Sequence, residues 1–159
     1  MIRAAILTIS DSCARGDRDD VSGRTIKGAL SGNEFTVVES RIVADDQDAI
    51  AATLKQLCAR PDINIVFTTG GTGLGPRDVT PEATMSVCER IVPGLGEIIR
   101  SKGWEKTKNA VLSRGVSGIR NNVLIINLPG SPKGARESLE VVLDVLPHAL
   151  LMMRGGGHL

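Results

Sequence analysis

The chain has 159 residues, the usual size of a single domain, and 42% of them are hydrophobic, which is enough to form a core. Aromatic residues make up only 2%, so the core must consist of Val, Ile, Leu and Ala. This scarcity excludes the aromatic platforms on which single-stranded nucleic acids stack. The net charge is +1 and there is no basic run, so we expect no nucleic-acid partner.

The same features favour a cytoplasmic protein. No segment is long and apolar enough to span a membrane, and the N-terminal residues lack the pattern of a signal peptide. Cys13, Cys58 and Cys88 are odd in number and have no C-x-x-C spacing, which is typical of free thiols in a reducing compartment. With only two histidines, a His-rich zinc site is not expected.

The predicted elements alternate between strands and helices. Apolar runs predict strands at 2–9, 35–43, 63–67 and 123–128. Helices are expected at 22–30, from the capping pair Asp45-Asp46 to Pro61, at 81–90, at 95–102 and at 133–146, where Pro147 restarts or kinks the helix. A polar loop is expected at 10–21, a break at Pro93-Gly94 and a turn at Asn121-Asn122, whereas 104–118 show no clear pattern.

This alternation predicts an α/β fold, a three-layer sandwich with a mostly parallel central sheet and helices on both faces. One domain is expected over residues 1–154, followed by a flexible tail at 155–159 that begins with three glycines. In such sheets, ligands bind beyond the carboxyl ends of the strands. The predicted strand exits all carry small, polar or acidic residues, so they are expected to line one crevice.

The most informative segment is 68–84, between the third strand and the next helix. Four of the six residues from 70 to 75 are glycines, which allow backbone N–H groups to converge and a ligand to approach closely. Thr80 is expected to cap the helix, with Pro81 at its first position. A strand, a glycine loop and a helix N-terminus together favour an anion site; the alternative is a tight turn whose glycines serve only the backbone.

Two familiar phosphate motifs are absent from this segment. It contains no Gly-x-x-x-x-Gly-Lys-Ser/Thr, and Pro76 stands where the dinucleotide fingerprint requires its third glycine. Asp78 lies in the loop, and a carboxylate beside a phosphate repels it unless a cation lies between them, which points to Mg²⁺. Asp45 follows the second strand. The alternatives are that Asp78 is only a loop acid and Asp45 only a helix cap.

Seven motifs at the strand exits and loops carry a family resemblance. They are Thr8-Ile9-Ser10-Asp11-Ser12, Val21-Ser22-Gly23, Val43-Ala44-Asp45-Asp46, Thr69-Gly70-Gly71-Thr72-Gly73, Pro76-Arg77-Asp78-Val79-Thr80-Pro81-Glu82-Ala83-Thr84, Leu112-Ser113-Arg114 with Gly118-Ile119-Arg120, and Asn127-Leu128-Pro129-Gly130-Ser131-Pro132. Over nearly its whole length the chain resembles the molybdenum-cofactor adenylyltransferases, which include bacterial molybdopterin adenylyltransferase and the gephyrin G domain. Ala44 departs from the proline of many members, which loosens the turn that presents Asp45.

The resemblance implies a step of molybdenum cofactor biosynthesis: Mg²⁺-dependent transfer of AMP from ATP to the terminal phosphate of molybdopterin, with release of pyrophosphate. It also implies a homotrimer, and the downstream molybdenum-insertion protein as a partner. The attacking phosphate oxygen is already anionic, so the chemistry requires positioning and charge neutralisation rather than a general base. The alternative is a molybdopterin-binding paralogue or scaffold of the same pathway without adenylyltransferase activity.

The resemblance gives Asp45 and Asp78 the catalytic and Mg²⁺-binding roles. The residues implied to contact ATP or molybdopterin are Ser10, Asp11, Ser12, Ser22, Gly23, Gly70, Gly71, Thr72, Gly73, Arg77, Glu82, Ser113, Arg114, Gly118, Asn127, Pro129, Gly130 and Ser131. Arg77 either pairs with Asp78 or faces a phosphate.

The helical region 133–153 carries two apolar rows. One row contains Leu139, Val142, Leu143, Leu146 and Leu150, and the other contains Val141, Val145, Ala149 and Met152. A helix on the surface of a monomer needs only one apolar face. The second row is therefore expected to contact a neighbouring subunit, unless it is buried within the core of one chain.

Overall fold

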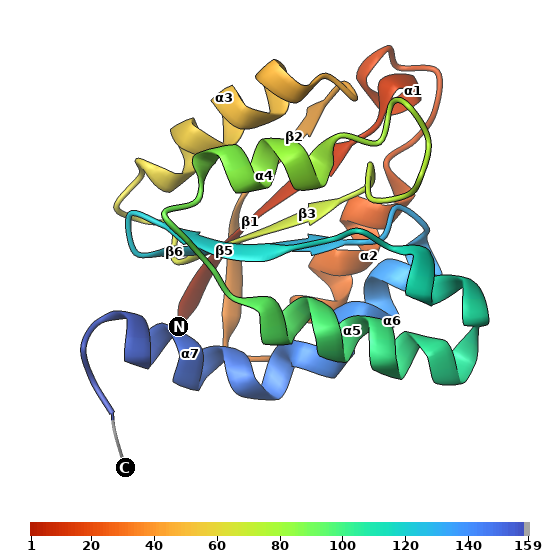
Figure 1. The fold of residues 1–159 in the computed structure, drawn as a ribbon. Coiled ribbons are helices and arrows are strands. Elements are labelled where there is room, and N and C mark those ends of the chain that lie inside the picture. Colours follow the sequence, from red (N-terminus) through yellow and green to blue (C-terminus); the bar gives the residue numbers. More distant parts are fainter. Residues whose placement is uncertain (158–159) are drawn as a thin grey trace.

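The computed structural model describes residues 1–157, so positions 158 and 159 of the expected tail lie outside the described residues. The expected three-layer α/β architecture is confirmed (Figure 1). The elements are β1 (Ile2–Ile9), α1 (Asp11–Ala14), α2 (Val21–Leu30), β2 (Phe35–Val43), α3 (Gln47–Cys58), β3 (Ile65–Thr69), α4 (Thr80–Val87), β4 (Arg90–Ile91), α5 (Pro93–Lys106), η1 (Lys108–Leu112), β5 (Ser117–Arg120), β6 (Val123–Leu128), α6 (Pro132–Val142), η2 (Leu143–Val145) and α7 (Leu146–Met153).

The sheet has six strands in the order β2-β1-β3-β6-β5-β4. The four strands predicted from apolar runs, β1, β2, β3 and β6, are parallel to their neighbours in this set. The antiparallel strands β5 and β4 extend the sheet beyond β6. The carboxyl ends of the four parallel strands therefore lie at one edge of the sheet.

Strand residues alternate between two apolar cores, one on each face of the sheet. Ile6 and Phe67 face the layer that contains α2, α5, α6 and α7, whereas Leu7 and Val66 face α3 and α4. Figure 1 shows these helical layers on opposite sides of the sheet. Both faces are covered, which explains why β3 and β6 are buried along their whole length and β1 along most of it, whereas the edge strand β2 carries exposed polar residues.

Several expected boundaries are wrong in the middle of the chain. The helix expected over 81–90 ends at Val87, and Arg90–Ile91 pair with β5 as a short edge strand. Pro93 begins α5 instead of breaking a helix, because a residue without an N–H is tolerated in the first turn. The loop expected at 10–21 contains the single-turn helix α1.

Two predictions near the C-terminal half are confirmed. Asn121 and Asn122 have φ angles of 49° and 61°, which form the tight turn between β5 and β6. The helix restarts around Pro147, which lies in the first turn of α7. Within residues 1–157, none of the helices combines the length and the hydrophobicity needed to cross a bilayer.

Helix capping also differs from the prediction, and the difference affects the site. Asp46 caps α3, because its Oδ2 accepts the N–H of Ala49 at 2.9 Å, so Asp45 is not the cap. Val79, not Thr80, precedes α4, and no side chain caps that helix. The Thr80 hydroxyl donates instead to the carbonyl of Gly70 at 2.9 Å. The Asp45 carboxylate is therefore available for a role other than capping.

Candidate active site

The exits of the parallel strands converge on one crevice. β1 is followed by α2 on one face of the sheet, and its neighbour β3 is followed by α4 on the other face (Figure 1). Because the connections from two neighbouring strands run to opposite faces of the sheet, they leave a crevice at the carboxyl ends of these strands. The loop after β3, the loop after β6 and the turn after β2 all border this space.

The glycine loop after β3 is held in a fixed shape. Gly70 and Gly71 have φ angles of 104° and 67°, which side chains disfavour, and a Cβ on Gly70 would overlap the Ile9 carbonyl. Thr69 Oγ1 donates to the carbonyl of Pro129 at 2.6 Å, which joins this loop to the one after β6. The structure thus brings together two of the motifs that the sequence placed far apart.

Arg114 holds the C-terminal part of the same loop through hydrogen bonds to its backbone. Its Nε donates to Gly73 O at 2.8 Å and its Nη2 to Asp78 O at 2.6 Å. Its Nη1 donates to Glu82 Oε2 at 2.8 Å, and this hydrogen bond lowers the pKa of the Glu82 carboxyl. Arg114 and Glu82 were expected to contact a ligand, but the structure engages both in holding the backbone that carries Asp78.

A second ionic cluster ties the turn after β2 to the exit of β1. The Asp11 N–H donates to Asp45 Oδ2 at 2.9 Å, and the Asp45 N–H donates to Asp11 Oδ1 at 3.0 Å. Arg77 donates from Nε and Nη2 to both oxygens of Asp11, at 3.0 and 2.9 Å. This hydrogen bonding lowers the pKa of Asp11. Arg77 therefore pairs with Asp11, and not with Asp78 as one of the two sequence interpretations had it.

Asp45 and Asp78 form an electrostatically unfavourable pair. Burial raises the pKa of Asp45, and the negative charges of Asp11 and Asp78 raise it further. A divalent cation between the two carboxylates would remove this repulsion. Among residues 1–157, no three or more His, Cys, Asp or Glu side chains are grouped to hold a metal ion. The pair still fits Mg²⁺, which usually takes one or two carboxylates together with substrate phosphates and water.

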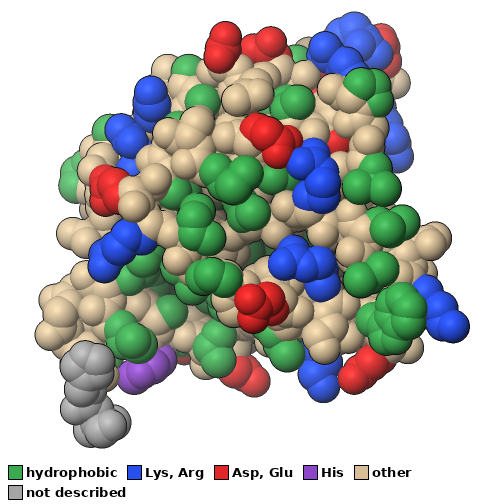
Figure 2. Space-filling model, in the orientation of Figure 1, with side chains coloured by type: hydrophobic (Ala, Val, Ile, Leu, Met, Phe, Trp, Pro, Cys, Tyr) green, Lys and Arg blue, Asp and Glu red, His purple; other side chains and the backbone are tan. Residues whose placement is uncertain are grey.

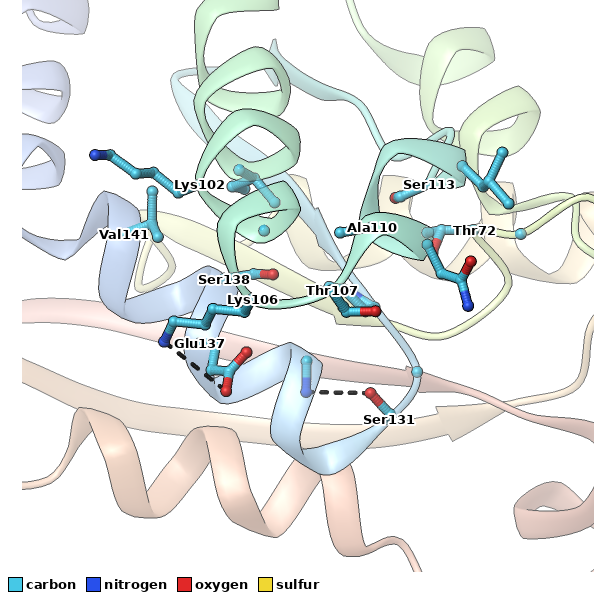
Figure 3. Close-up of a pocket in the computed structure, with 18 of the residues that line it drawn as sticks. Thr72, Lys102, Lys106, Thr107, Ala110, Ser113, Ser131, Glu137, Ser138 and Val141 are labelled. Carbon is cyan, nitrogen blue, oxygen red and sulfur yellow. Dashed lines mark hydrogen bonds and ion pairs between the residues drawn. The ribbon is translucent and has the colours of Figure 1, made fainter.

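A cavity of about 660 Å³ opens beside the glycine loop (Figure 3), within the size range of small-molecule sites. It lies between that loop, the loop after β6, and the elements α5, η1 and α6. The expected site residues that line it are Gly71, Thr72, Gly73, Asp78, Ser113, Pro129, Gly130 and Ser131.

A smaller cavity of about 60 Å³ lies next to it, and Gly130 lines both. Its walls include Thr8, Ser10, Cys13, Asp20, Ser22 and Gly70. Ser22 Oγ donates to Gly130 O at 2.7 Å, and the hydroxyls of Ser10 and Ser12 lie 3.2 Å apart. The structure therefore places the expected serines of the first strand exit beside the glycine loop.

Nine of the expected site residues line neither cavity, Asp45 and Asp11 among them, and three of these nine serve the framework. Gly23 donates its N–H to Asp20 Oδ1 at 2.9 Å, which caps α2. Gly118 packs against Cys88, whose Sγ would lie 2.5 Å from a Cβ at that position. Asn127 is buried and donates to the hydroxyls of Thr68 and Thr84, both at 3.0 Å. Their contacts support the framework rather than a ligand.

Sequence reasoning missed the other half of the large cavity. Ile99, Lys102, Gly103 and Lys106 line it from α5, and Gly134, Glu137, Ser138 and Val141 line it from α6. Both sets follow the i, i+3, i+4, i+7 spacing of one helix face. That spacing is visible in the sequence, but only the packing of α5 against α6 turns the two stripes toward the same space.

Comparison with known proteins identifies the family of the chain. Residues 5–148 match the family described as "Probable molybdopterin binding domain". The molybdopterin adenylyltransferase of Haemophilus influenzae is 47% identical over 147 residues, covering 91% of this chain and 74% of that protein. The one from Helicobacter pylori J99 is 42% identical over 156 residues, covering 97% and 89%. The structure of the molybdopterin biosynthesis enzyme MoaB from Thermus thermophilus has 50% identity, a TM-score of 0.92 and 98% coverage of both chains. The chain therefore belongs to the molybdopterin-binding domain family that includes the molybdopterin adenylyltransferases.

Proposed function

We propose that this protein is a molybdopterin adenylyltransferase of molybdenum cofactor biosynthesis. It transfers AMP from ATP to the terminal phosphate of molybdopterin and releases pyrophosphate. The observation that carries the proposal is that Asp45 and Asp78 both approach the glycine loop: a Cβ on Gly71 would lie 3.2 Å from Asp45 Oδ1, and a Cβ on Gly73 would lie 2.9 Å from Asp78 Oδ2. The negative charge of Asp78 also contributes to the raised pKa of Asp45. Relatives named molybdopterin adenylyltransferase that are 39–47% identical over most of the chain support the same reaction.

In this reaction a phosphate oxygen of molybdopterin attacks the α-phosphorus of ATP, and the bond to the bridging oxygen of pyrophosphate breaks. Asp45 and Asp78 would hold Mg²⁺, which neutralises charge on the phosphates when it is bound. The glycine loop presents backbone N–H groups to the same phosphates, beside the N-terminus of α4. Because the attacking phosphate oxygen is already anionic, no residue has to act as a general base. The role of this chain is instead to align the two phosphates and to exclude water from the site.

We assign direct substrate contacts to the expected residues that line the cavities, among them Ser10, Thr72, Ser113 and Ser131. Ser12 lies one contact from the small cavity, through Ser10, whereas Arg77 pairs with Asp11, which lines neither cavity. We assign supporting roles to Gly23, Glu82, Arg114, Gly118 and Asn127, because their polar atoms or their available space are taken up by the protein itself.

The decisive experiment is product analysis. The purified protein would be incubated with molybdopterin, ATP labelled in the α-phosphate, and Mg²⁺, and adenylyl-molybdopterin and pyrophosphate would be measured. We expect both products in equal amounts, and neither when Mg²⁺ is chelated. Failure to form them with intact molybdopterin would contradict the proposal.

The second candidate is a molybdopterin-binding protein of the same pathway without transferase activity. One observation favours it: the family that residues 5–148 match is described by the binding of molybdopterin and not by transfer of a nucleotide. Thermal unfolding separates the two functions, because a ligand that binds only the folded state raises the melting temperature. An adenylyltransferase is stabilised by ATP with Mg²⁺, whereas a pure molybdopterin carrier is stabilised by molybdopterin alone.

We also propose that the protein is a cytoplasmic homotrimer that passes its product to the molybdenum-insertion protein. Half of the second apolar row of 133–153 supports association, because Val145 and Met152 are exposed on the single chain. The other two residues of the row, Val141 and Ala149, pack against the core of the same chain. A second surface could serve as the subunit interface instead. Figure 2 shows apolar side chains in the middle of the visible face. The exposed apolar residues of α4, β4 and α5 include Met85, Ile91 and Ile98.

Sedimentation equilibrium tests the trimer and its interface. Val145→Asp should dissociate the assembly, because a charge placed in an apolar contact is left unpaired. Lys55→Asp, on the exposed side of α3, is the control and should leave the assembly intact. Dissociation by Ile91→Asp alone would move the interface to the region over α4 and α5. A wild-type species of 16.8 kDa would refute association.

A further inference from the structure

The large cavity has two chemically different ends. Thr72 and Ser113 lie at the end beside the glycine loop, and Lys106, Glu137 and Val141 lie at the other end (Figure 3). We call the second end the α5–α6 slot; it is lined by Ile99, Lys102, Gly103, Lys106, Ala110, Glu137, Ser138 and Val141. A substrate that fills the cavity must place one part at each end.

Glu137 is the unusual residue of the α5–α6 slot. Only 25% of its side chain is exposed, and its one ionic contact is a distance of 3.8 Å between Oε1 and Lys106 Nζ. Within residues 1–157, no hydrogen bond reaches either carboxylate oxygen of Glu137. A mostly buried carboxylate normally accepts hydrogen bonds, so this one is equipped to accept them from a ligand.

The arrangement of donors and acceptors in the slot matches one class of heterocycle. A carboxylate only accepts, through two oxygens, and a lysine ammonium only donates. Glu137 and Lys106 therefore present two acceptors beside a donor. The 2-amino-4-oxo edge of a pterin presents two N–H donors beside a carbonyl acceptor. Adenine presents one amino donor beside an unprotonated ring nitrogen, which would face a carboxylate oxygen and be repelled.

The walls of the slot suit a flat ring. Ile99 is almost fully buried, and it packs in the same apolar core as the half-buried Val141. Both line the cavity, together with the small residues Gly103 and Ala110. Ligand sites of this kind combine apolar walls with a few polar groups that fix the orientation of the ligand.

We propose that the α5–α6 slot binds the pterin ring of molybdopterin, with Glu137 accepting from the 2-amino and N3–H groups and Lys106 donating to the 4-oxo oxygen. The proposal rests on the function proposed above and specifies which end of the cavity each substrate occupies. The terminal phosphate of molybdopterin then points toward Asp78, at the end where ATP must react. Glu137 is the residue that distinguishes a pterin from an adenine.

The test is Glu137→Gln, which keeps the shape of the side chain but replaces one acceptor oxygen with an amino donor. Equilibrium titration of molybdopterin should show a dissociation constant raised on the order of tenfold to a hundredfold, as expected for loss of hydrogen bonds to a charged group. The dissociation constant of ATP with Mg²⁺ should change by less than about twofold, since the nucleotide binds elsewhere. Glu140→Gln is the matched control, because Glu140 lies on the same helix but pairs with Arg136 on the surface.

A pair of small probes isolates the recognised edge. 6-Hydroxymethylpterin and 6-hydroxymethyllumazine share the N3–H and 4-oxo groups, but the 2-amino group of the pterin is replaced in the lumazine by a 2-oxo group next to an N1–H. The wild type and Glu140→Gln should prefer the pterin, and Glu137→Gln should lose this preference.

Unchanged binding of molybdopterin by Glu137→Gln would overturn the proposal, and so would weakened binding of ATP alone. The proposed function fails separately, if the wild type forms no adenylyl-molybdopterin. In that case a weakened affinity of Glu137→Gln for molybdopterin would still support the pterin site, in a protein that only binds molybdopterin.

Discussion

The two ends of the large cavity hold their carboxylates in opposite ways. At the glycine-loop end, Asp78 Oδ2 accepts the Gly75 N–H at 2.9 Å, and the Asp78 carbonyl is held by Arg114. At the α5–α6 slot, Glu137 has one distant partner, Lys106. The difference fits the two tasks proposed above. Phosphoryl chemistry needs atoms that are fixed before the substrates arrive, whereas recognition of a ring needs acceptors that are still free to be used.

The largest effect is expected from Asp78→Asn. Removing a key electrostatic group typically costs on the order of a hundredfold in rate, so AMP transfer should fall at least that far. The fold should persist, because the amide oxygen can still accept the Gly75 N–H. Steady-state transfer and circular dichroism would be measured, with Asp48→Asn on the surface of α3 as the control. Activity above about a tenth of the wild type would remove Asp78 from the centre of the mechanism.

A smaller effect is expected from Arg114→Lys. This variant tests whether the position of Asp78 depends on the hydrogen bonds that Arg114 donates to the glycine loop. Lysine cannot reproduce the fork of contacts to Gly73, Asp78 and Glu82, so the loop should loosen. We expect about a tenfold loss of turnover and a higher Mg²⁺ requirement, because Asp78 is no longer aligned. Kinetics at varied Mg²⁺ check this, with Arg136→Lys in an exposed ion pair as the control.

The coupling between Arg114 and Glu82 gives a sharper form of this test. If both act through the loop, Arg114→Lys and Glu82→Gln should be less than additive in the double variant. Fully additive losses would show that the two side chains act independently, as separate substrate contacts would.

The smallest effect concerns stability. The raised pKa of Asp45 means that its charged form is disfavoured in the folded state, so its contribution to stability is lost as pH rises through the folded pKa. Asp45→Asn removes the charge and should raise the melting temperature at neutral pH without Mg²⁺ by about 1–3 °C, while transfer is lost. The gain should vanish at pH values below the ordinary range of an aspartate. A lower melting temperature at neutral pH would show that Asp45 is structural.

Much of the fold could be predicted because local signals agree with the packing. The apolar runs of β1, β2 and β6 predicted their bounds without error, and Asn121-Asn122 marked the β5–β6 turn. The antiparallel edge could not be predicted. β4 has only two residues, both exposed, and β5 has four, which is too few for a periodic pattern, and their pairing is long-range.

The candidate site likewise contains one part that could be predicted from a local motif and another that could not. The glycine loop and Asp78 are contiguous in sequence, so their chemistry is visible there. Asp45 and Asp46 are adjacent, and only the geometry shows that Asp46 caps α3 while Asp45 meets Asp11. Lys106 and Glu137 each look like ordinary surface charges on amphipathic helices. Their shared position in one cavity depends on how α5 packs against α6, which no local pattern encodes.

The burial of two cysteines gives the protein a convenient property for spectroscopy. All three cysteines are free, and burial raises the pKa of Cys58 to about 12 and that of Cys88 to about 11. Near neutral pH these two thiols contain almost no reactive thiolate. Cys13, on the wall of the small cavity, is then the first to react with a maleimide fluorophore. A single dye can thus be attached next to the strand exits without mutagenesis, where its emission would report on the nucleotide binding proposed above.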